Sequence, residues 1–291
     1  MLIPKTGQTA PQWGERAVAL ATDLRNNAAK AVTRAKDRIA AAEADISLAR
    51  SAETSARNSS NADALTVARE AVAVSEEDLQ LAHQYLKIAT SFLAEREQVL
   101  ADIQKNVSTQ NKAARGMIVP EKGNIRRFAA DGTPVTDFSQ PLRTGERITT
   151  DAGGQAHLFL AKGDAEVDLQ GSSSLSIQQD DDKGFLAGLD EGIARFNARL
   201  KAWANKKFAV RTPAAVCAVR GTEFIVTAHG SKTTIKVLTG NVVVTSSGGK
   251  DAMTMNTGES AIITPEGIAT APSSSAGSAD SLKGAGYVPS H

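Results

Sequence analysis

The first hundred residues repeat apolar side chains in alternating steps of three and four, and this spacing is the strongest constraint on the fold. One series consists of Ala28, Val32, Ala35, Ile39, Ala42, Ile46 and Ala49. A second consists of Leu65, Ala68, Val72, Ser75, Leu79, Ala82, Leu86, Ala89, Leu93 and Leu100, interrupted by Arg96. Such spacing places apolar side chains along one stripe of an α-helix. We therefore expect two long helices within residues 11–110.

Between the two series lies a short polar segment, residues 57–63, which is rich in cap and turn formers. The surrounding sequence is rich in the helix formers Ala, Glu, Arg and Leu and has no proline after Pro11. Two apolar stripes joined by a short turn predict an antiparallel coiled-coil hairpin.

The predicted seam contributes little stability, because each alanine buries little apolar area and burial contributes roughly 25 cal/mol per Å². A second face could be covered by another copy or by the rest of the chain. Its candidates are Val18, Leu20, Leu24, Leu48, Val74, Leu81, Ile88 and Phe92. The hairpin could therefore act as a spacer, assemble a homo-oligomer or bind another protein.

From Gly116 the apolar period changes to two, and glycines recur at short intervals. Residues 165–169 alternate, with Ala165, Val167 and Leu169 on one face. We expect an all-β domain over 117–270, solenoid- or sandwich-like, and a flexible Ser/Ala/Gly-rich tail over 271–291. The fold class is thus α plus β in separate domains. Residues 192–203 could be a strand or a short helix.

The β region carries an ordered series of short motifs. Thr212-Pro213 comes first and is followed by Val219-Arg220-Gly221-Thr222-Glu223-Phe224. A strand then ends in Leu238-Thr239-Gly240 before a run of valines, and Gly258-Glu259 closes the series. Upstream, residues 142–150 contain a Gly-acid-x-Ile-x-Thr pattern from Gly145 to Thr150.

This order resembles the FecR domain family over roughly residues 117–265. The family is best known for extracytoplasmic domains of regulators that relay a signal from an outer-membrane receptor to a sigma factor. Those regulators place an anti-sigma segment and one transmembrane helix before the domain, whereas here the hairpin takes that place. The resemblance therefore implies a non-catalytic, periplasmic or otherwise extracytoplasmic protein-interaction domain.

Three residues are candidates for partner binding: Arg220, Glu223 and Trp203. Arg220 and Glu223 could instead form an ion pair that holds a bend at Gly221. Trp203 stands beside three lysines and could be an exposed anchor or a rim residue of the β core.

The sequence offers little for catalysis, metals or cofactors. Cys217, the single cysteine, lies in an apolar run and is expected to be buried. The four histidines are scattered without metal-ligand spacing, so we expect no metal site, no cofactor and no enzymatic activity.

Lys plus Arg number 33 against 32 Asp plus Glu. This balance gives the chain no overall positive potential that would attract nucleic acid. No apolar run approaches the ~20 residues of a membrane span. The N-terminal residues lack a secretory signal, so we expect either a cytosolic protein or one whose signal has been removed.

Two functions fit these features. The first is a scaffold of the bacterial cell envelope that binds an envelope protein or a cell-wall glycan. The alternative is an extracytoplasmic sensor in a pathway that regulates a sigma factor.

Overall fold

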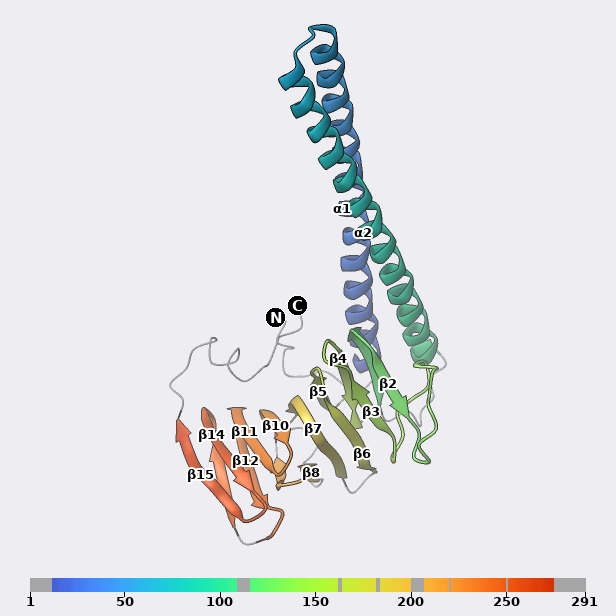
Figure 1. Ribbon diagram of the computed structural model, residues 1–291. Helices are drawn as coiled ribbons and strands as arrows, with labels where there is room; N and C mark the ends of the chain where they lie inside the picture. Colours follow the sequence, from blue (N-terminus) through green and yellow to red (C-terminus); the bar gives the residue numbers. More distant parts are fainter. Residues whose placement is uncertain are drawn as a thin grey trace. The chain divides into compact units, whose positions relative to one another are not determined.

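The computed structural model describes residues 12–108, 116–161, 164–181, 184–199, 207–219, 221–249 and 251–274. Two long helices precede a large curled β-sheet region, which confirms the predicted fold class (Figure 1). The chain divides into two compact units. One comprises residues 19–101, and the other combines both hairpin ends, up to 18 and from 102, with the β region.

Helix α1 spans Gln12–Asn58 and helix α2 spans Ala62–Ser108, each of 47 residues. Each is therefore roughly 70 Å long at ~1.5 Å per residue. The polar turn between them has Ser60 at a φ of 52°. Asn61 begins the second helix as a cap, because its Oδ1 accepts a hydrogen bond from the Ala64 amide at 3.0 Å.

The predicted seam holds the two helices together. Ala28, Ala35 and Ala82 are at most 1% exposed, and the other seam positions are buried or half-buried. Arg50 pairs with Glu76 at 2.8 Å and Arg69 with Glu53 at 3.2 Å, so residue numbers rise on one helix as they fall on the other. The helices are therefore antiparallel.

The β region consists of short strands joined by tight turns. In chain order they are β1 Met117–Lys122, β2 Ile125–Phe128, β3 Arg147–Thr150, β4 Gln155–Leu160, β5 Ala165–Leu169, β6 Ser174–Asp180, β7 Gly184–Ala198, β8 Lys207–Arg211, β9 Ala215–Val219, β10 Glu223–His229, β11 Lys232–Thr239, β12 Asn241–Ser246, β13 Ala252–Asn256, β14 Glu259–Thr264 and β15 Gly267–Ser274.

These strands form two groups of ladders that share β7. One group follows the order β1-β4-β5-β7-β10-β11-β14-β15, and the other follows β2-β3-β6-β7-β8-β9-β12-β13. The first half of β7 pairs with β6 and β8, and its second half pairs with β5 and β10. Gly192, at a φ of 97°, lies where β7 passes between the groups. One continuous sheet is thereby curled into two layers.

A single hydrophobic cluster lies between these layers. It includes Leu158 and Val237 of the first group and Ile148 and Val244 of the second. Phe196 and Phe224 stack in it with ring centroids 5.4 Å apart. The period-two pattern of the sequence produces this cluster, because alternate side chains of each strand point inward.

Two segments need comparison with the sequence expectations. Residues 192–198 are strand, the end of β7, whereas the sequence left strand and helix open. Strand β15 continues to Ser274, four residues into the segment expected to be tail, because its main chain pairs with β14. Main-chain pairing does not require apolar side chains, so the Ser-rich composition gave no sign of it. Residues 275–291 lie outside the described part of the chain.

Candidate interaction surfaces

Helix α2 exposes a row of large apolar side chains. Among the described residues, eight large hydrophobic side chains are exposed, and six of them lie on α2. Their exposed fractions range from 37% for Phe92 to 66% for Val67 and Ile88. The other members are Val74, Leu81 and Tyr85. Such side chains are unremarkable singly, but a row of them on one helix is a candidate interaction surface.

The row follows a second heptad repeat, distinct from the seam. Val67, Val74, Leu81 and Ile88 are each seven residues apart, and Tyr85 and Phe92 follow Leu81 and Ile88 by four. Steps of three and four place all six on one helix face. We call this face the outer stripe: residues 67, 71, 74, 78, 81, 85, 88, 92, 95 and 99. Asp78 and Glu95 are its charged members.

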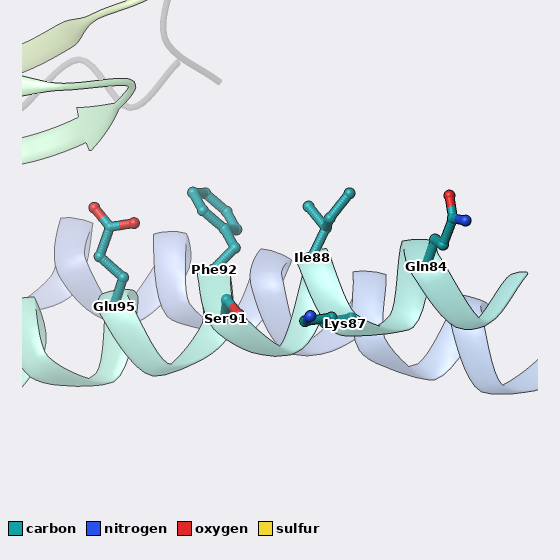
Figure 2. Close-up of a pocket in the computed structure, with 6 residues that line it drawn as sticks. All are labelled: Gln84, Lys87, Ile88, Ser91, Phe92 and Glu95. Carbon is teal, nitrogen blue, oxygen red and sulfur yellow. The ribbon is translucent and has the colours of Figure 1, made fainter. Parts of the chain in front are cut away.

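Figure 2 shows the central part of the outer stripe. Gln84, Ile88, Phe92 and Glu95 project to one side of α2, and together with Lys87 and Ser91 they line a shallow groove. Ile88 and Phe92 lie between Glu95 and Gln84 along the helix. The sequence identified Val74, Leu81, Ile88 and Phe92 as candidates for a second face. It missed Val67 and Tyr85, which the seven-residue spacing could have identified.

The opposite side of α2 carries the ion pairs with α1. Arg69 and Glu76 each follow an outer-stripe valine by two residues, which is about 200° around the helix. The two described helices thus have one charged side, closed by ion pairs, and one apolar side on α2.

The motif residues of the β region fix two adjacent turns. Gly240, at a φ of 88°, ends β11, and a Cβ there would lie 2.7 Å from the main-chain oxygen of Gly221. Thr222 Oγ1 donates a hydrogen bond to the Asn241 carbonyl at 2.7 Å. The links β9–β10 and β11–β12 therefore pack main chain against main chain, which requires glycine at this contact.

The remaining motif residues also stabilise turns. Thr212 Oγ1 accepts from the Ala215 amide at 3.0 Å and bonds to Thr233 Oγ1 at 2.7 Å, so it closes the turn between β8 and β9, which also contains Pro213. Glu259 Oε2 accepts from the Asn256 amide at 2.6 Å beside Gly258, whose φ is 86°.

The three candidates for partner binding are not brought together among the described residues. Glu223 forms an ion pair with Arg195, which comes from the neighbouring strand β7. Arg220 and Trp203 lie outside the described residues, so the Arg220–Glu223 pair and the anchoring role of Trp203 stay predictions.

A buried ion pair explains the acidic residue of the upstream motif. Arg127 donates to both carboxylate oxygens of Glu146, at 2.8 and 2.9 Å. It also donates to the main-chain oxygens of Gln140 and Pro141, at 2.7 and 2.6 Å. The Arg127 side chain is 0% exposed and that of Glu146 is 6%. This pair therefore joins β2 to the start of β3 and holds the loop between them.

A histidine cluster occupies the outer side of β4 and β5. His157 Nδ1 lies 2.6 Å from Asp168 Oδ1 on the paired strand, and its Nε2 lies 3.7 Å from Glu166. Glu166 also forms ion pairs with Arg199 and with Arg16 of α1, a residue of the unit that contains the β region. Sequence spacing could not find this cluster, because strand pairing and the hairpin end bring its members together.

Burial alone would lower the pKa of His157. The hydrogen bond that His157 donates to Asp168 and the charges of Asp168, Glu166 and Glu121 outweigh burial and hold the pKa above its ordinary value of 6.5. One potential metal-ligand atom from each of Glu121, His157 and Asp168 lies within 4.8 Å of the other two. A metal ion there would displace the His157–Asp168 hydrogen bond, so we interpret the cluster as a hydrogen-bonded network that favours the protonated form of His157.

Cys217 lies in β9 and is 0% exposed, which confirms the expected buried position. Burial raises the pKa of its thiol to about 12. A thiol in this setting is not a nucleophile near neutral pH.

The fold and these contacts define a class: a helical hairpin joined to a curled β domain whose short motifs build turns. Residues 146–243 match the family described as FecR protein, which confirms the resemblance for that segment. The match runs from the acidic partner of Arg127 to the middle of β12.

Two solved structures are similar to part of the chain. Both are crystal structures of a Parabacteroides distasonis protein described as a "putative anti-sigma factor", at 1.65 and 2.50 Å resolution. Each is 24% identical with a TM-score of 0.39, and the match covers 44% of this chain and 59% of that one. Among curated proteins, none matches this chain. Neither described helix is apolar enough over a sufficient length to cross a membrane.

Proposed function

We propose that this chain is a non-enzymatic regulator that acts by binding other proteins in an extracytoplasmic pathway controlling a sigma factor. The observation that carries the proposal is the FecR match over residues 146–243. The family is best known for domains that relay a signal from a receptor toward a sigma factor. The β domain would be the part that contacts its signalling partner.

The described side chains support a binding role over a catalytic one. His157 is engaged by Asp168, and Cys217 lies in the core with its pKa raised to about 12. The motif residues Thr212, Thr222 and Gly240 are occupied in building turns.

A second candidate is the envelope scaffold, which would bind an envelope protein or a cell-wall glycan. The outer stripe of α2 favours it, because a long apolar helix face serves assembly. Both candidates use the chain as an interaction protein and differ in whether its loss changes transcription.

The experiment is a deletion of the gene in its own bacterium, followed by measurement of all transcripts. The strain is complemented with the wild-type chain, with Gly240→Val, which disrupts the β domain, or with Gly258→Ala, which places a side chain in open space. The abundance of each variant is measured in the same cells.

If the chain is a regulator, deletion should change the expression of one set of genes several-fold. These genes should all depend on a single alternative sigma factor. Wild type and Gly258→Ala should restore expression, and Gly240→Val should not. Unchanged transcription together with a defective envelope would contradict the regulator and favour the scaffold.

A further inference from the structure

The β region exposes arginines whose positive charge is not neutralised by a neighbouring carboxylate. Three of its described arginines form ion pairs: Arg127, Arg195 and Arg199. The others are exposed and form no ion pair with the described residues: Arg126, Arg143, Arg147 and Arg211. Since charged partners are available elsewhere in the domain, these unpaired arginines are candidates for contact with another molecule.

Three of the unpaired arginines lie on the same face of the sheet. Successive side chains of a strand point to opposite faces. Ile148 of β3 and Val210 of β8 lie in the core, so their neighbours Arg147 and Arg211 point outward. Arg126 points outward from β2 in the same way, because the next residue of that strand is buried. The outer face of β2, β3, β6, β7 and β8 therefore carries a basic surface.

Strand register places Arg147 and Arg211 in one row across this surface. Arg147 lies opposite Ser176 of β6, which lies opposite Gly188 of β7. Gly188 in turn lies opposite Arg211 of β8. Three strand spacings of ~4.8 Å separate the two arginines by about 14 Å. A Cβ at Gly188 would collide with Gln178, so glycine leaves room for that side chain to cross β7 within the row.

Both arginines of the row are oriented by uncharged neighbours. The guanidinium carbon of Arg147 lies 5.4 Å from the centre of the Phe128 ring on the paired strand. Arg211 Nη1 donates a hydrogen bond to Gln178 Oε1 at 3.3 Å. A guanidinium group has five N–H donors, so these contacts leave donors for a further acceptor. The row thus presents two partly oriented cations with their charge unspent.

The described carboxylates near this surface are fewer than its arginines. Asp190 of β7 is exposed two residues beyond Gly188. Asp181 follows β6, where its Oδ2 accepts a hydrogen bond from Gln179 Nε2 at 3.0 Å. The surface therefore favours a partner that carries negative charge.

We propose that the outer face of β2, β3, β6, β7 and β8 binds an extended acidic segment of a partner protein. Side chains four residues apart in an extended chain lie on one side and are ~13 Å apart. This spacing matches that of Arg147 and Arg211, so each guanidinium group would donate paired hydrogen bonds to one of two carboxylates. Nucleic acid or an anionic membrane fits less well, because a dense array of phosphates would meet Asp190 as well as the arginines.

This inference deepens the proposed function, on which its cellular role rests, by giving the chemistry of the partner. Binding is measured with purified protein, whereas the regulatory role is measured by transcription. A failure of one is therefore distinguishable from a failure of the other.

The test is a titration of the full-length protein into short fluorescent peptides at low ionic strength, followed by anisotropy. Two peptides of threonine and serine carry two glutamates each and have the same composition. In one peptide the glutamates are four residues apart, and in the other they are three apart, on opposite sides of an extended chain. Protein concentrations reach about 1 mM, which detects even weak binding.

The peptide with the four-residue spacing should bind roughly threefold or more tightly than the other. Arg147→Gln and Arg211→Gln should each weaken its binding by roughly threefold or more. The matched control is Arg34→Gln/Arg38→Gln, which removes two exposed arginines of α1 and should leave binding unchanged.

Three results would overturn the inference. Absence of peptide binding, or equal binding of both peptides, would exclude the row of Arg147 and Arg211 as the site. A loss in the control equal to that in Arg147→Gln would show attraction by net charge alone. Tighter binding of phosphatidylglycerol vesicles or duplex DNA that depends on Arg147 and Arg211 would exclude a polypeptide as the occupant.

Discussion

At the scale of single residues, the backbone conformation favours glycine at both Gly240 and Gly258, but a close contact also requires it at Gly240. Both have positive φ, 88° and 86°. A Cβ at Gly240 meets the Gly221 oxygen at 2.7 Å, whereas one at Gly258 meets nothing within 4 Å. The two glycines belong to the same motif series but are required for different reasons.

We expect Gly258→Ala to lower the free energy of unfolding by about 1–2 kcal/mol, the cost of a left-handed side chain. Gly240→Ala adds a steric clash and should lose about 2–5 kcal/mol in total. Chemical denaturation of the full chain, followed by tryptophan fluorescence, measures both. Equal losses would show that the packing of the two links does not constrain Gly240.

His157 should make stability depend on pH. Its pKa is raised in the folded chain because Asp168, Glu166 and Glu121 favour the protonated form more than burial disfavours it. The protonated imidazole therefore contributes its full stabilisation below about 6.5, the ordinary value. That stabilisation is lost as the pH rises through the folded pKa.

Melting temperatures measured from pH 5.5 to 9 test this assignment. As His157 loses its proton, the melting temperature of wild type should fall above about pH 6.5. The His157→Gln variant should lack this fall. His83→Gln, an exposed position on α2, should keep the wild-type slope. Arg16 and Arg199 also face the cluster, through their ion pairs with Glu166. A His157→Gln slope equal to that of wild type would exclude the protonated network.

At the scale of elements, Arg127 and Glu146 hold β2, β3 and the loop between them. Removing one partner leaves a buried charge, so Arg127→Met or Glu146→Leu should each cost about 3–5 kcal/mol of unfolding free energy. The double variant Arg127→Met/Glu146→Leu should cost much less than the sum. Denaturant unfolding measures the cycle, with Arg126→Met, an exposed neighbour, as the control. Additive losses would contradict the coupling.

The elements themselves were largely predictable, because helices and strands each produce a characteristic spacing of apolar residues in the sequence. Steps of three and four identified both helices and their seam, and alternation identified β5 with its bounds Ala165–Leu169. The burial of Glu166 could not be predicted, since Arg16 and Arg199 cover it from distant parts of the chain. The end of β7 was ambiguous because a short apolar run fits strand and helix equally.

The candidate surfaces were only partly predictable. The second face of the hairpin follows from spacing alone, and four of its members were identified. The histidine cluster depends on strand register and on the hairpin end, neither of which spacing encodes. The motif residues pointed to the correct family segment, but their roles in the turns required the contacts of Gly240, Thr222 and Thr212.

At the scale of the whole molecule, the helical hairpin and the β domain have different features. The FecR segment, residues 146–243, lies in a β domain whose motifs build turns. The hairpin exposes the apolar outer stripe on α2.

The most direct measurement is the abundance of all transcripts in the gene-deletion strain complemented with each variant. We expect one set of genes that depends on a single alternative sigma factor to change several-fold on deletion. The wild-type chain and Gly258→Ala should restore its expression, and Gly240→Val should not. Unchanged transcription in the deletion strain would contradict the account.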